Sequence, residues 1–318
     1  MTDLEQHLLA IIQDAFPLEK RPYQVLADQL GSDEQSVFAA VEGLRKSGII
    51  RRIGGVYDSK ALGFISRLCA GKVPTVVTGA ADDNALEKFA AAVNEIPAIT
   101  HNYVRSHEYN VWFTVIAQSE EEIQKIVDDV CAKTELHDVH VLSATKKYKI
   151  NTVMGGVVRR ALQPCKIPAR ILSDLDRTRI HIACDDIPHS LTPFKDWGVS
   201  CEELREDLAL KRMRRFGAIL RHQEAGFAFN AMVCLAELDK SPNNSAGAIL
   251  AQKPFISHCY DRPAFEGFPY TLYAMMHAQS ADELDRNIKE AAESIGNPDY
   301  VVLHSVRELK KTSYRFFA

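Results

Sequence analysis

The sequence predicts an α+β protein built as a tandem repeat, in which each copy joins a winged helix-turn-helix to a ferredoxin-like βαββαβ unit. Two repeated segments support the duplication. "RRIGGVYDSKALGF" from Arg51 matches "RRFGAILRHQEAGF" from Arg214, an offset of 214 − 51 = 163, and "ITHNYVR" from Ile99 returns as "ISHCYDR" from Ile256. The third observation is that segments with helical periodicity and segments with strand periodicity follow one another in the same order in both copies. We therefore expect two halves of about 155 residues each that pack as a pseudo-dimer.

The composition is that of an ordinary globular protein. Of the 318 residues, 46% are apolar and 25% are charged, and the net charge is −4, so the chain can bury two cores. The seven cysteines are odd in number and widely spaced, which argues against a disulfide framework or a clustered zinc site. The acidic N-terminus and the lack of a long apolar run argue against a signal peptide and a membrane span. We expect a cytoplasmic protein.

Residues 1–60 are predicted to form the first winged helix-turn-helix. Apolar residues recur at helical spacing until Gly31 interrupts them. A further helix is expected to begin at Ser32, where Gln35 three residues later completes a capping-box pattern, and to end at Gly48. Three short helices followed by "IIRRIGGVYDS" are typical of this module.

Residues 168–222 are predicted to be a degenerate copy of the same head. Each copy has a proline followed by an aromatic residue some way before its paired arginines. The distance from Pro22 to Arg51 is 51 − 22 = 29 residues in the first copy, and that from Pro193 to Arg214 is 214 − 193 = 21 in the second. We assign the eight lost residues to the turn and the third helix. Two unequal heads cannot present the matched half-sites that dimeric regulators use.

The ferredoxin-like units are assigned to residues 61–160 and 223–318. In the first unit we expect strand 64–72, helix 82–94, strand 98–105, strand 109–117, helix 120–133 and strand 138–145. In the second we expect strand 227–238, helix 243–252, strand 255–262, strand 269–278, helix 281–295 and strand 299–306. Both copies open the second helix with a capping-box pattern, Ser119/Glu122 and Ser280/Glu283.

The repeated "HxYxR" pattern is the main clue to function. Because side chains alternate along a strand, one face should carry Ile99, His101, Tyr103 and Arg105, and the other Thr100, Asn102 and Val104. The second copy places Ile256, His258, Tyr260 and Arg262 in the same way. A single histidine here would more often be a satisfied interface residue, but its paired recurrence favours a shared cavity for an anionic ligand.

A helix-turn-helix joined to this unit resembles the Lrp/AsnC class of transcription regulators, whose effector domains pair through their sheets. DNA binding is nevertheless not expected. The segment "SDEQSVFAAVEGL" carries Asp33, Glu34 and Glu42 and has no cation before Arg45, so its surface should repel phosphates. The basic segment from Lys211 to Gly217 fits a solvated face, a residual nucleic-acid patch or an anion site equally well.

Longer motifs resemble a second family. "THNYVRSHEYNVWFT" in the first half, and "SHCYDR", "FPYTLYAMMH" and "RELKKTS" in the second, are similar to the two related subunits of siroheme decarboxylase, here in a fused arrangement. The resemblance implies removal of the C12 and C18 acetate carboxyl groups of siroheme, giving 12,18-didecarboxysiroheme and CO2 in haem d1 or alternative haem biosynthesis. It implies no cofactor beyond the substrate iron. The expected partners are siroheme, later enzymes of haem d1 biosynthesis and, as an option, a second copy.

Siroheme needs flat apolar walls and a rim of cations. The candidate side chains against the macrocycle are Tyr103, Tyr260, His107, Tyr109, Trp112, Tyr270 and Tyr273. The candidate carboxylate clamps are Arg105, Arg262, Arg214, Arg215 and Arg221.

Histidines are the candidates for iron binding and proton transfer. His101 or His258 could be the axial ligand of the siroheme iron. Loss of CO2 leaves electron density on a methylene carbon, and a histidine near neutral pKa could return a proton, with His222 and His258 placed ahead of His101 and His107. Two other hypotheses remain, a DNA-binding regulator and a haem sensor or carrier without turnover.

Overall fold

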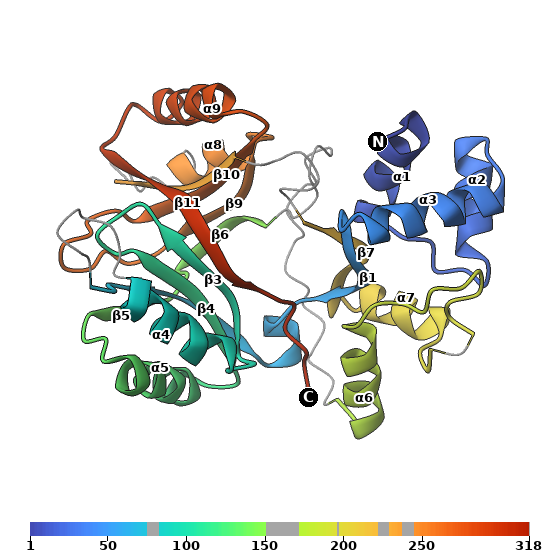
Figure 1. The fold of residues 1–318 in the computed structure, drawn as a ribbon, viewed down its shortest axis with the longest axis horizontal. Helices are drawn as coiled ribbons and strands as arrows, with labels where there is room; N and C mark the ends of the chain where they lie inside the picture. The colour runs from blue at the N-terminus through green and yellow to red at the C-terminus, as the bar shows by residue number, and fades with distance from the viewer. Residues whose placement is uncertain (75–82, 151–171, 196, 222–228, 237–244, 318) are drawn as a thin grey trace.

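The two heads are joined by a two-stranded ribbon. The structure, a computed structural model, describes residues 1–74, 83–150, 172–195, 197–221, 229–236 and 245–317. The first head contains α1 (Asp3–Asp14), α2 (Pro22–Leu30), α3 (Glu34–Lys46) and β1 (Ile50–Tyr57), and the second contains α6 (Asp174–Ala183), α7 (Cys201–Ala209) and β7 (Met213–Leu220). Strands β1 and β7 pair antiparallel with Gly54 opposite Gly217 (Figure 1). The matched segments therefore pair with each other, and their arginine pairs lie at opposite ends of the ribbon, with Arg52 opposite Ile219 and Arg215 opposite Val56.

The helix signals of the first head are largely confirmed. Gly31 and Gly48 both adopt positive φ, 64° and 79°, which glycine tolerates without a Cβ clash. The cap of α3 was wrongly assigned to Ser32. Asp33 caps this helix instead, since its carboxylate accepts the amide hydrogen of Ser36, and a carboxylate also interacts favourably with the positive end of the helix.

The contraction of the second head falls on a different helix from the one expected. Between α6 and α7 the described residues contain no helix, whereas α2 occupies the equivalent stretch of the first head. The helix before the ribbon is kept as α7, with 9 residues against 13 in α3. The second helix is thus lost and the third is only shortened, because the third packs on the ribbon and the short second helix can be replaced by a loop.

The predicted ferredoxin-like units are confirmed. The first unit comprises β2 (Ile65–Gly71), α4 (Asp83–Asn94), β3 (Ile99–Arg105), β4 (Val111–Ala117), α5 (Glu120–Thr134) and β5 (Val139–Leu142). The second comprises β8 (Phe229–Leu235), α8 (Ala246–Ala251), β9 (Ile256–Asp261), β10 (Leu272–Ala278), α9 (Ala281–Glu293) and β11 (Tyr300–Lys311). A short helical turn (Lys60–Leu62) precedes β2, and one unpredicted strand, β6 (Lys146–Ile150), follows β5.

The two units exchange edges. The nine described strands of the sheet run in the order β5-β2-β4-β3-β11-β8-β10-β9-β6. β11 pairs with β8 of its own unit through Tyr300–His304 and with β3 of the other unit through Ser305–Lys311. β6 pairs in the same way with β9 of the second unit. Each half therefore covers an edge of the other, as a pseudo-dimer requires.

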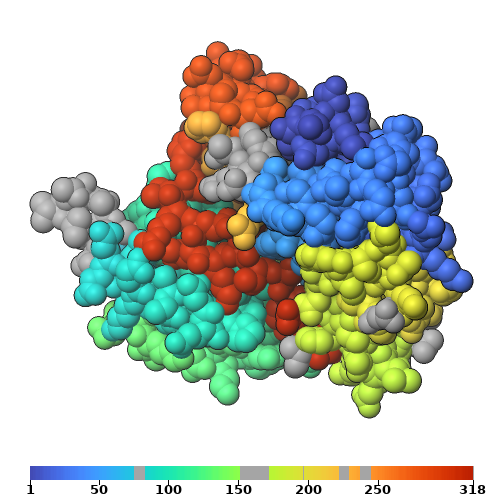
Figure 2. Space-filling model, turned by 45° about the vertical axis from the view of Figure 1, so that its right-hand side comes forward, coloured from blue at the N-terminus to red at the C-terminus, as the bar shows by residue number. Residues whose placement is uncertain are grey.

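Apolar residues pack in three layers around the strands. One core lies under α4 and α5 and another under α8 and α9, on opposite outer sides of the strands (Figure 1). A third core lies between the two units, where Trp112 of the first meets Phe268 and Tyr273 of the second. Figure 2 shows the C-terminal segment, in red, between the first unit and the heads.

Part of the predicted face assignment was wrong. Ile99 belongs to the helix-side core together with Val104, and Ile256 lies with Cys259 in the equivalent core. The cause is a bulge in each strand, since the registers of β3 and β9 skip one residue just before the histidine. An extra residue reverses the alternation of the residues before it.

Two further expectations concern the ends of the helices and the membrane. Ser119 and Ser280 cap α5 and α9, but Glu122 and Glu283 accept the amide hydrogens of Gln118 and Gln279, one residue before each cap. Within the described ranges, no helix is long and apolar enough to cross a bilayer.

Candidate active site

His258 and Tyr260 of β9, together with Arg262 directly after this strand, form a continuous stripe, called the second stripe here. The rings of His258 and Tyr260 are stacked with centroids 6.2 Å apart, and the guanidinium of Arg262 lies 5.2 Å from the Tyr260 ring centroid. Arg262 donates a hydrogen bond to the carbonyl oxygen of Leu142 at 2.5 Å. All three side chains are partly accessible, yet burial shifts their pKa values. They therefore line a recess.

Cations from two other strands surround this stripe. Lys147 on β6 lies opposite Tyr260, and burial, Arg214 and Arg262 all lower its pKa, which the carboxylate of Asp58 opposes. Arg214 reaches the stripe from β7 of the second head, because its charge also lowers the pKa values of Tyr260 and His258. Like charges gathered in a partly desolvated recess make an anion site.

His258 is neutral in the free protein. Burial, followed by the charges of Arg214, Lys149 and Lys311, lowers its pKa from 6.5 to about 4. Its Nδ1 lies 2.9 Å from the hydroxyl oxygen of Ser257. Among the described residues no group makes a hydrogen bond to its Nε2. Within the described ranges, the ring is thus held by a hydrogen bond on its Nδ1 side alone.

The first stripe, on β3, has the same outline but a different chemistry. Arg105 is buried and donates to the carbonyl oxygen of Leu303 at 3.1 Å and to the Ser305 hydroxyl at 3.2 Å. Its guanidinium lies 5.3 Å from the Tyr103 ring centroid. Burial raises the pKa of Tyr103, and the charge and hydrogen bond of Glu308 raise it further.

Matched positions show where the stripes differ. Glu308 lies opposite Tyr103 as Lys147 lies opposite Tyr260, and the two positions are related by the repeat offset of 308 − 147 = 161. Arg51 and Lys311 surround Glu308, with the Lys311 ammonium 3.7 Å from its carboxylate. The first stripe therefore already contains a carboxylate where the second contains a cation.

The stripes approach each other without merging. Lys311 lies opposite His101 in the β3–β11 ladder, and its charge also acts on His258. Arg105 lies 3.9 Å from the sulfur of Met275, the residue opposite His258 in the β9–β10 ladder. The sequence-predicted histidines and tyrosines of the two halves thus lie on the two sides of β11.

Several predicted wall residues lie in the core instead. The exposed fraction is 1% for Trp112 and 2% for both Tyr109 and Tyr273. Tyr109 donates to the carbonyl oxygen of Glu266, and His107 and Tyr270 pack against Phe268 in the same cluster. The burial of Trp112, Tyr109 and Tyr273 argues against the ligand contacts predicted for them, because these rings fill the interface between the two units. His107 and Tyr270 are partly accessible.

Apart from Arg105 of the first stripe, the predicted arginines separate into three groups. Arg214 and Arg262 belong to the second stripe. Arg215 is buried and donates to the carbonyl oxygens of Gln13 and Ala218, so its proposed role as a clamp was wrong, since the residue after Arg214 faces the other side of β7. Arg221 is exposed beside Arg51. His222 lies outside the described residues.

The sequence contained signals for the residues that were missed. Arg51 matches Arg214 in the repeated "RR" segments, and Lys147 and Glu308 are matched in "ATKKYK" and "SVRELK". Likewise, "HAQS" and "IAQS" place His277 at the position of Ile116. Comparing the two halves position by position would have found all of them.

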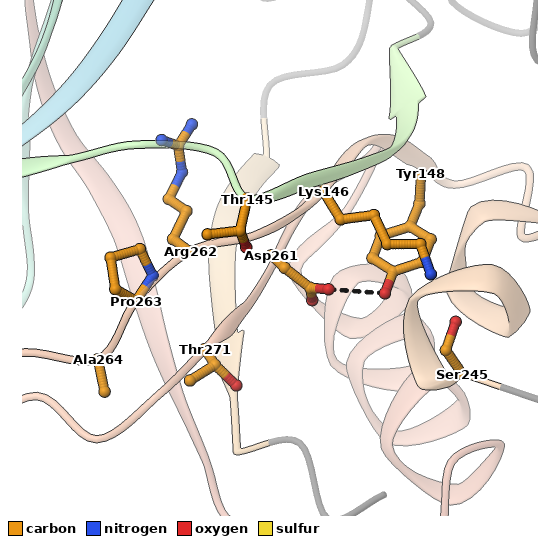
Figure 3. Close-up of a pocket in the computed structure, with 9 residues that line it drawn as sticks. All are labelled: Thr145, Lys146, Tyr148, Ser245, Asp261, Arg262, Pro263, Ala264 and Thr271. Atoms are coloured by element: carbon orange, nitrogen blue, oxygen red, sulfur yellow. Dashed lines mark hydrogen bonds between the residues drawn. The ribbon is translucent and has the colours of Figure 1, made fainter. Parts of the chain in front are cut away.

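A groove opens beside the second stripe on the other side of β9. It encloses about 620 Å³ and is lined by Thr145, Lys146, Tyr148, Ser245, Asp261, Arg262, Pro263, Ala264 and Thr271. In Figure 3 the Tyr148 hydroxyl donates to Asp261, and the side chain of Arg262 points away from that pair. His258 and Tyr260 do not line this groove, so it shares only Arg262 with the second stripe.

Comparisons with known proteins agree with this architecture. A family model described as an AsnC-like ligand binding domain matches residues 61–149 and 224–310, and the siroheme decarboxylase NirDL-like HTH domain matches residues 5–51. A siroheme decarboxylase of Hydrogenobacter thermophilus is 33% identical over 98% of this chain and 94% of that protein. The chain belongs to the siroheme decarboxylase family.

Other members of the siroheme decarboxylase family match in part or in full. The alpha subunit of the Desulfovibrio desulfuricans siroheme decarboxylase is 45% identical over 47% of this chain and 82% of that subunit. The crystal structure of the siroheme decarboxylase NirDL in complex with an iron-uroporphyrin III analogue is similar with a TM-score of 0.69 and 28% identity, over 99% of this chain and 95% of that one. The family therefore explains both the fold and the repeat.

Proposed function

We propose that the protein is a siroheme decarboxylase that removes the carboxyl groups of the C12 and C18 acetate side chains, giving 12,18-didecarboxysiroheme and CO2. The observation that carries this proposal is the cluster of Arg214, Lys147 and Arg262 around His258 and Tyr260. Siroheme is a polycarboxylate, and a desolvated cluster of cations binds such a ligand strongly. Membership of the family supports the same substrate.

The second stripe supplies the groups that this substrate needs. Arg214 and Arg262 hold carboxylates by paired hydrogen bonds, and Lys147 adds a third charge. The stacked rings of His258 and Tyr260, with Arg262 next to Tyr260, form an aromatic stripe for the macrocycle. Binding of the unreactive carboxylates orients the reacting acetate.

The reaction breaks one carbon–carbon bond and makes one carbon–hydrogen bond. When the bond between the methylene carbon and the carboxylate breaks, its electron pair stays on the methylene carbon and spreads into the conjugated ring. A proton delivered from the side of His258 then converts the arm into a methyl group. Each of the two decarboxylations consumes one proton and releases one CO2.

We place this reaction at the second stripe and not at the first. In the first stripe Glu308 already occupies the cationic surroundings of Arg51 and Lys311. A second carboxylate there would meet like charge. His101 and Tyr103 are accordingly assigned no part in the reaction.

A DNA-binding function is not supported by the charges of the head. Asp33 caps α3, and Glu34 forms an ion pair with Arg21. Arg45, one of the two cations in the last turn of α3, is held by Asp186 and Glu42. Phosphate binding would have to break these pairs.

The cofactor, the cellular location and the partners of the reaction are part of the same proposal. The iron arrives with the substrate, and we propose no other cofactor. We also propose a cytoplasmic location, since the six cysteines of the described ranges form no disulfide. Hand-over to later enzymes of haem d1 biosynthesis, and pairing with a second copy, remain expectations.

The test is a turnover assay. Purified protein is mixed with siroheme under anaerobic conditions and the tetrapyrrole is weighed by mass spectrometry. We expect the loss of two carboxyl groups as CO2 in the presence of the protein and none in its absence. Siroheme that binds and is recovered unchanged would indicate a sensor or carrier, and salt-dependent binding to duplex DNA without turnover would indicate a regulator.

A further inference from the structure

We infer that residues 263–271, called the clasp loop here, hold Arg262 in place by docking on the first unit, with His140 and Phe265 as positioning residues. The inference rests on the proposed function, because that function gives Arg262 a carboxylate of the substrate to bind. The clasp loop joins β9 to β10 and starts directly after Arg262 (Figure 3). It therefore begins at the second stripe.

The clasp loop is four residues longer than its counterpart in the first half. The repeat offset is 262 − 105 = 157 at the two arginines and 277 − 116 = 161 after the loop, a gain of 161 − 157 = 4 residues. The same backbone hydrogen bond closes both loops, from Arg105 to Asn110 and from Arg262 to Thr271, each at 2.8 Å. The extra residues therefore lie within the clasp loop itself.

The middle of the clasp loop has a defined shape. Phe265 and Phe268 exchange two backbone hydrogen bonds, at 3.1 and 2.9 Å, and their rings are stacked with centroids 5.0 Å apart. Between them Gly267 adopts a φ of 75°, which glycine tolerates because it has no Cβ. The loop thus presents two phenyl rings in a fixed arrangement.

The first unit receives the clasp loop at β5. The ring of His140 is stacked on that of Phe265 with centroids 4.1 Å apart, and Tyr109 meets the same ring edge-on at 4.8 Å. The Tyr109 hydroxyl donates to the carbonyl oxygen of Glu266 at 3.1 Å. His140 is itself held, since its Nε2 lies 2.8 Å from the carboxylate of Asp138. Ring contacts of this kind stabilise an interface beyond the area they bury, so the tip of the loop is anchored.

Arg262 is attached to the same short strand. Its guanidinium donates to the carbonyl oxygen of Leu142, two residues after His140 on β5. The guanidinium and the tip of the clasp loop therefore contact nearby positions of one four-residue strand. Because Arg262 lies at the base of the loop, release of Phe265 from His140 would let the arginine move relative to Leu142.

The first half holds its arginine in another way. Arg105 donates to the carbonyl oxygen of Leu303 at 3.1 Å and to the Ser305 hydroxyl at 3.2 Å. The counterpart of Ser305 in the first unit is Ala144, at the repeat offset of 305 − 144 = 161. A methyl group accepts no hydrogen bond, so Arg262 keeps for a ligand a donor that Arg105 commits to the protein.

The clasp loop compensates for the missing acceptor. Paired hydrogen bonds to a carboxylate need a guanidinium in a fixed plane, and a side chain that is mobile before binding loses more entropy when it binds. The counterpart of His140 is Val301, at the offset of 301 − 140 = 161, which has no ring to stack. Within the described residues, the long loop and the imidazole thus both serve the arginine that lacks the second acceptor.

The first test measures affinity for iron-uroporphyrin III by titration of its absorption band. His140→Ala and Phe265→Ala should each weaken binding by about 3- to 10-fold, because Arg262 is then no longer held in the geometry that a carboxylate requires. His140→Phe should restore the affinity, since it returns a ring that stacks on Phe265. Val301→Ala, the matched change in the other half, should leave the affinity unchanged.

A double-mutant cycle separates positioning from general packing. In an Arg262→Gln background, Phe265→Ala should cause no further loss of affinity, because the clasp loop acts through a guanidinium that is now absent. Additive losses from the two substitutions would overturn the inference. Unchanged affinity in both His140→Ala and Phe265→Ala would overturn it as well.

A second measurement uses the free protein and needs no ligand. In 15N-labelled protein, relaxation of the Arg262 Nε–Hε group reports the motion of this side chain on the ps–ns timescale. The motion should be restricted in the wild-type protein and in His140→Phe, and of larger amplitude in Phe265→Ala. Equal motion in the wild-type protein and Phe265→Ala would contradict the role of the clasp loop.

The outcomes separate the clasp loop from the proposed function. If the wild-type protein decarboxylates siroheme and the His140→Ala and Phe265→Ala variants bind the macrocycle as tightly as it does, the inference is wrong and the function stands. If the wild-type protein releases no CO2 from siroheme, the proposed function fails, and the motion of Arg262 alone decides whether the loop holds it.

Discussion

At the scale of single residues, small differences between matched positions decide what each stripe can do. Both stripes keep histidine, tyrosine and arginine, and both place a hydroxyl beside the imidazole. The second adds Lys147 where the first has Glu308. Charges act strongly at a partly desolvated site. With a carboxylate at the matched position the first stripe prefers a cation or a hydroxyl group, and with an ammonium group there the second stripe prefers a carboxylate.

The pair Lys147 and Glu308 offers matched variants. Lys147→Glu should weaken binding of iron-uroporphyrin III by about 10-fold or more, since one unfavourable contact of this kind is worth at least 1.4 kcal/mol or so. Glu308→Lys, the mirror change, should not weaken it. Titration of the absorption band gives both affinities, and equal losses in the two variants would contradict the assignment of the second stripe.

The pH dependence of stability follows from His258. Its pKa is 6.5 when unperturbed and about 4 in the fold. Above pH 6.5 the ring is neutral in both the folded and the unfolded protein. Between pH 6.5 and 4 the unfolded chain binds a proton that the folded chain does not, so the free energy of unfolding decreases as the pH falls through this interval.

The variant His258→Gln should lose less stability over this interval than the wild-type protein. Urea denaturation of both proteins at pH 7.5 and pH 5 measures the difference. Parallel losses in the two proteins would show that His258 is not held neutral by its surroundings.

At the scale of elements, the β1–β7 ribbon joins the heads to the site, since Arg214 extends from it to the second stripe. The close approach of the helices to this ribbon depends on glycines. A Cβ on Gly217 would lie 2.5 Å from the carbonyl oxygen of Ile12, at the end of α1. Backbone atoms cannot move aside as a flexible side chain can.

Gly217→Ala should therefore destabilise the protein by about 1–3 kcal/mol and lower Tm. Gly43→Ala is the control, because the nearest atom to its Cβ is 3.9 Å away and alanine is the better helix former by about 1 kcal/mol. Equal Tm values for the two variants would contradict the close packing of α1 on the ribbon.

At the scale of the whole molecule, the duplication explains what could and could not be predicted from the sequence. Repeated segments and matched caps predicted both ferredoxin-like units, because each unit is specified by local periodicity. The edge exchange of β6 and β11 could not be predicted, since it depends on pairing between halves that are distant in sequence. The bulges at Thr100 and Ser257 were missed for the same reason, because the register belongs to two strands together.

The candidate site was predicted to a similar extent. The stripe residues were singled out because they recur. Trp112, Tyr109 and Tyr273 were assigned to a ligand wall although they are buried, because an aromatic ring fits a ligand wall and a sheet interface equally well. Only the burial of the ring distinguishes a ligand wall from a sheet interface, and the alternation of residues along a strand does not reveal that burial.

The account predicts that one molecule of tetrapyrrole binds per chain, although the chain contains two stripes. Titration of the protein with iron-uroporphyrin III should give an end point near one equivalent. An end point of two would mean that Glu308 does not exclude a second anionic ligand.

The most direct measurement compares His258→Gln with His101→Gln in anaerobic turnover of siroheme, with the product weighed by mass spectrometry. The account predicts that His101→Gln removes both carboxyl groups at the wild-type rate and that His258→Gln is slower by about 100-fold or more. Equal activity of the two variants, or loss of activity in His101→Gln alone, would contradict the placement of the reaction at the second stripe.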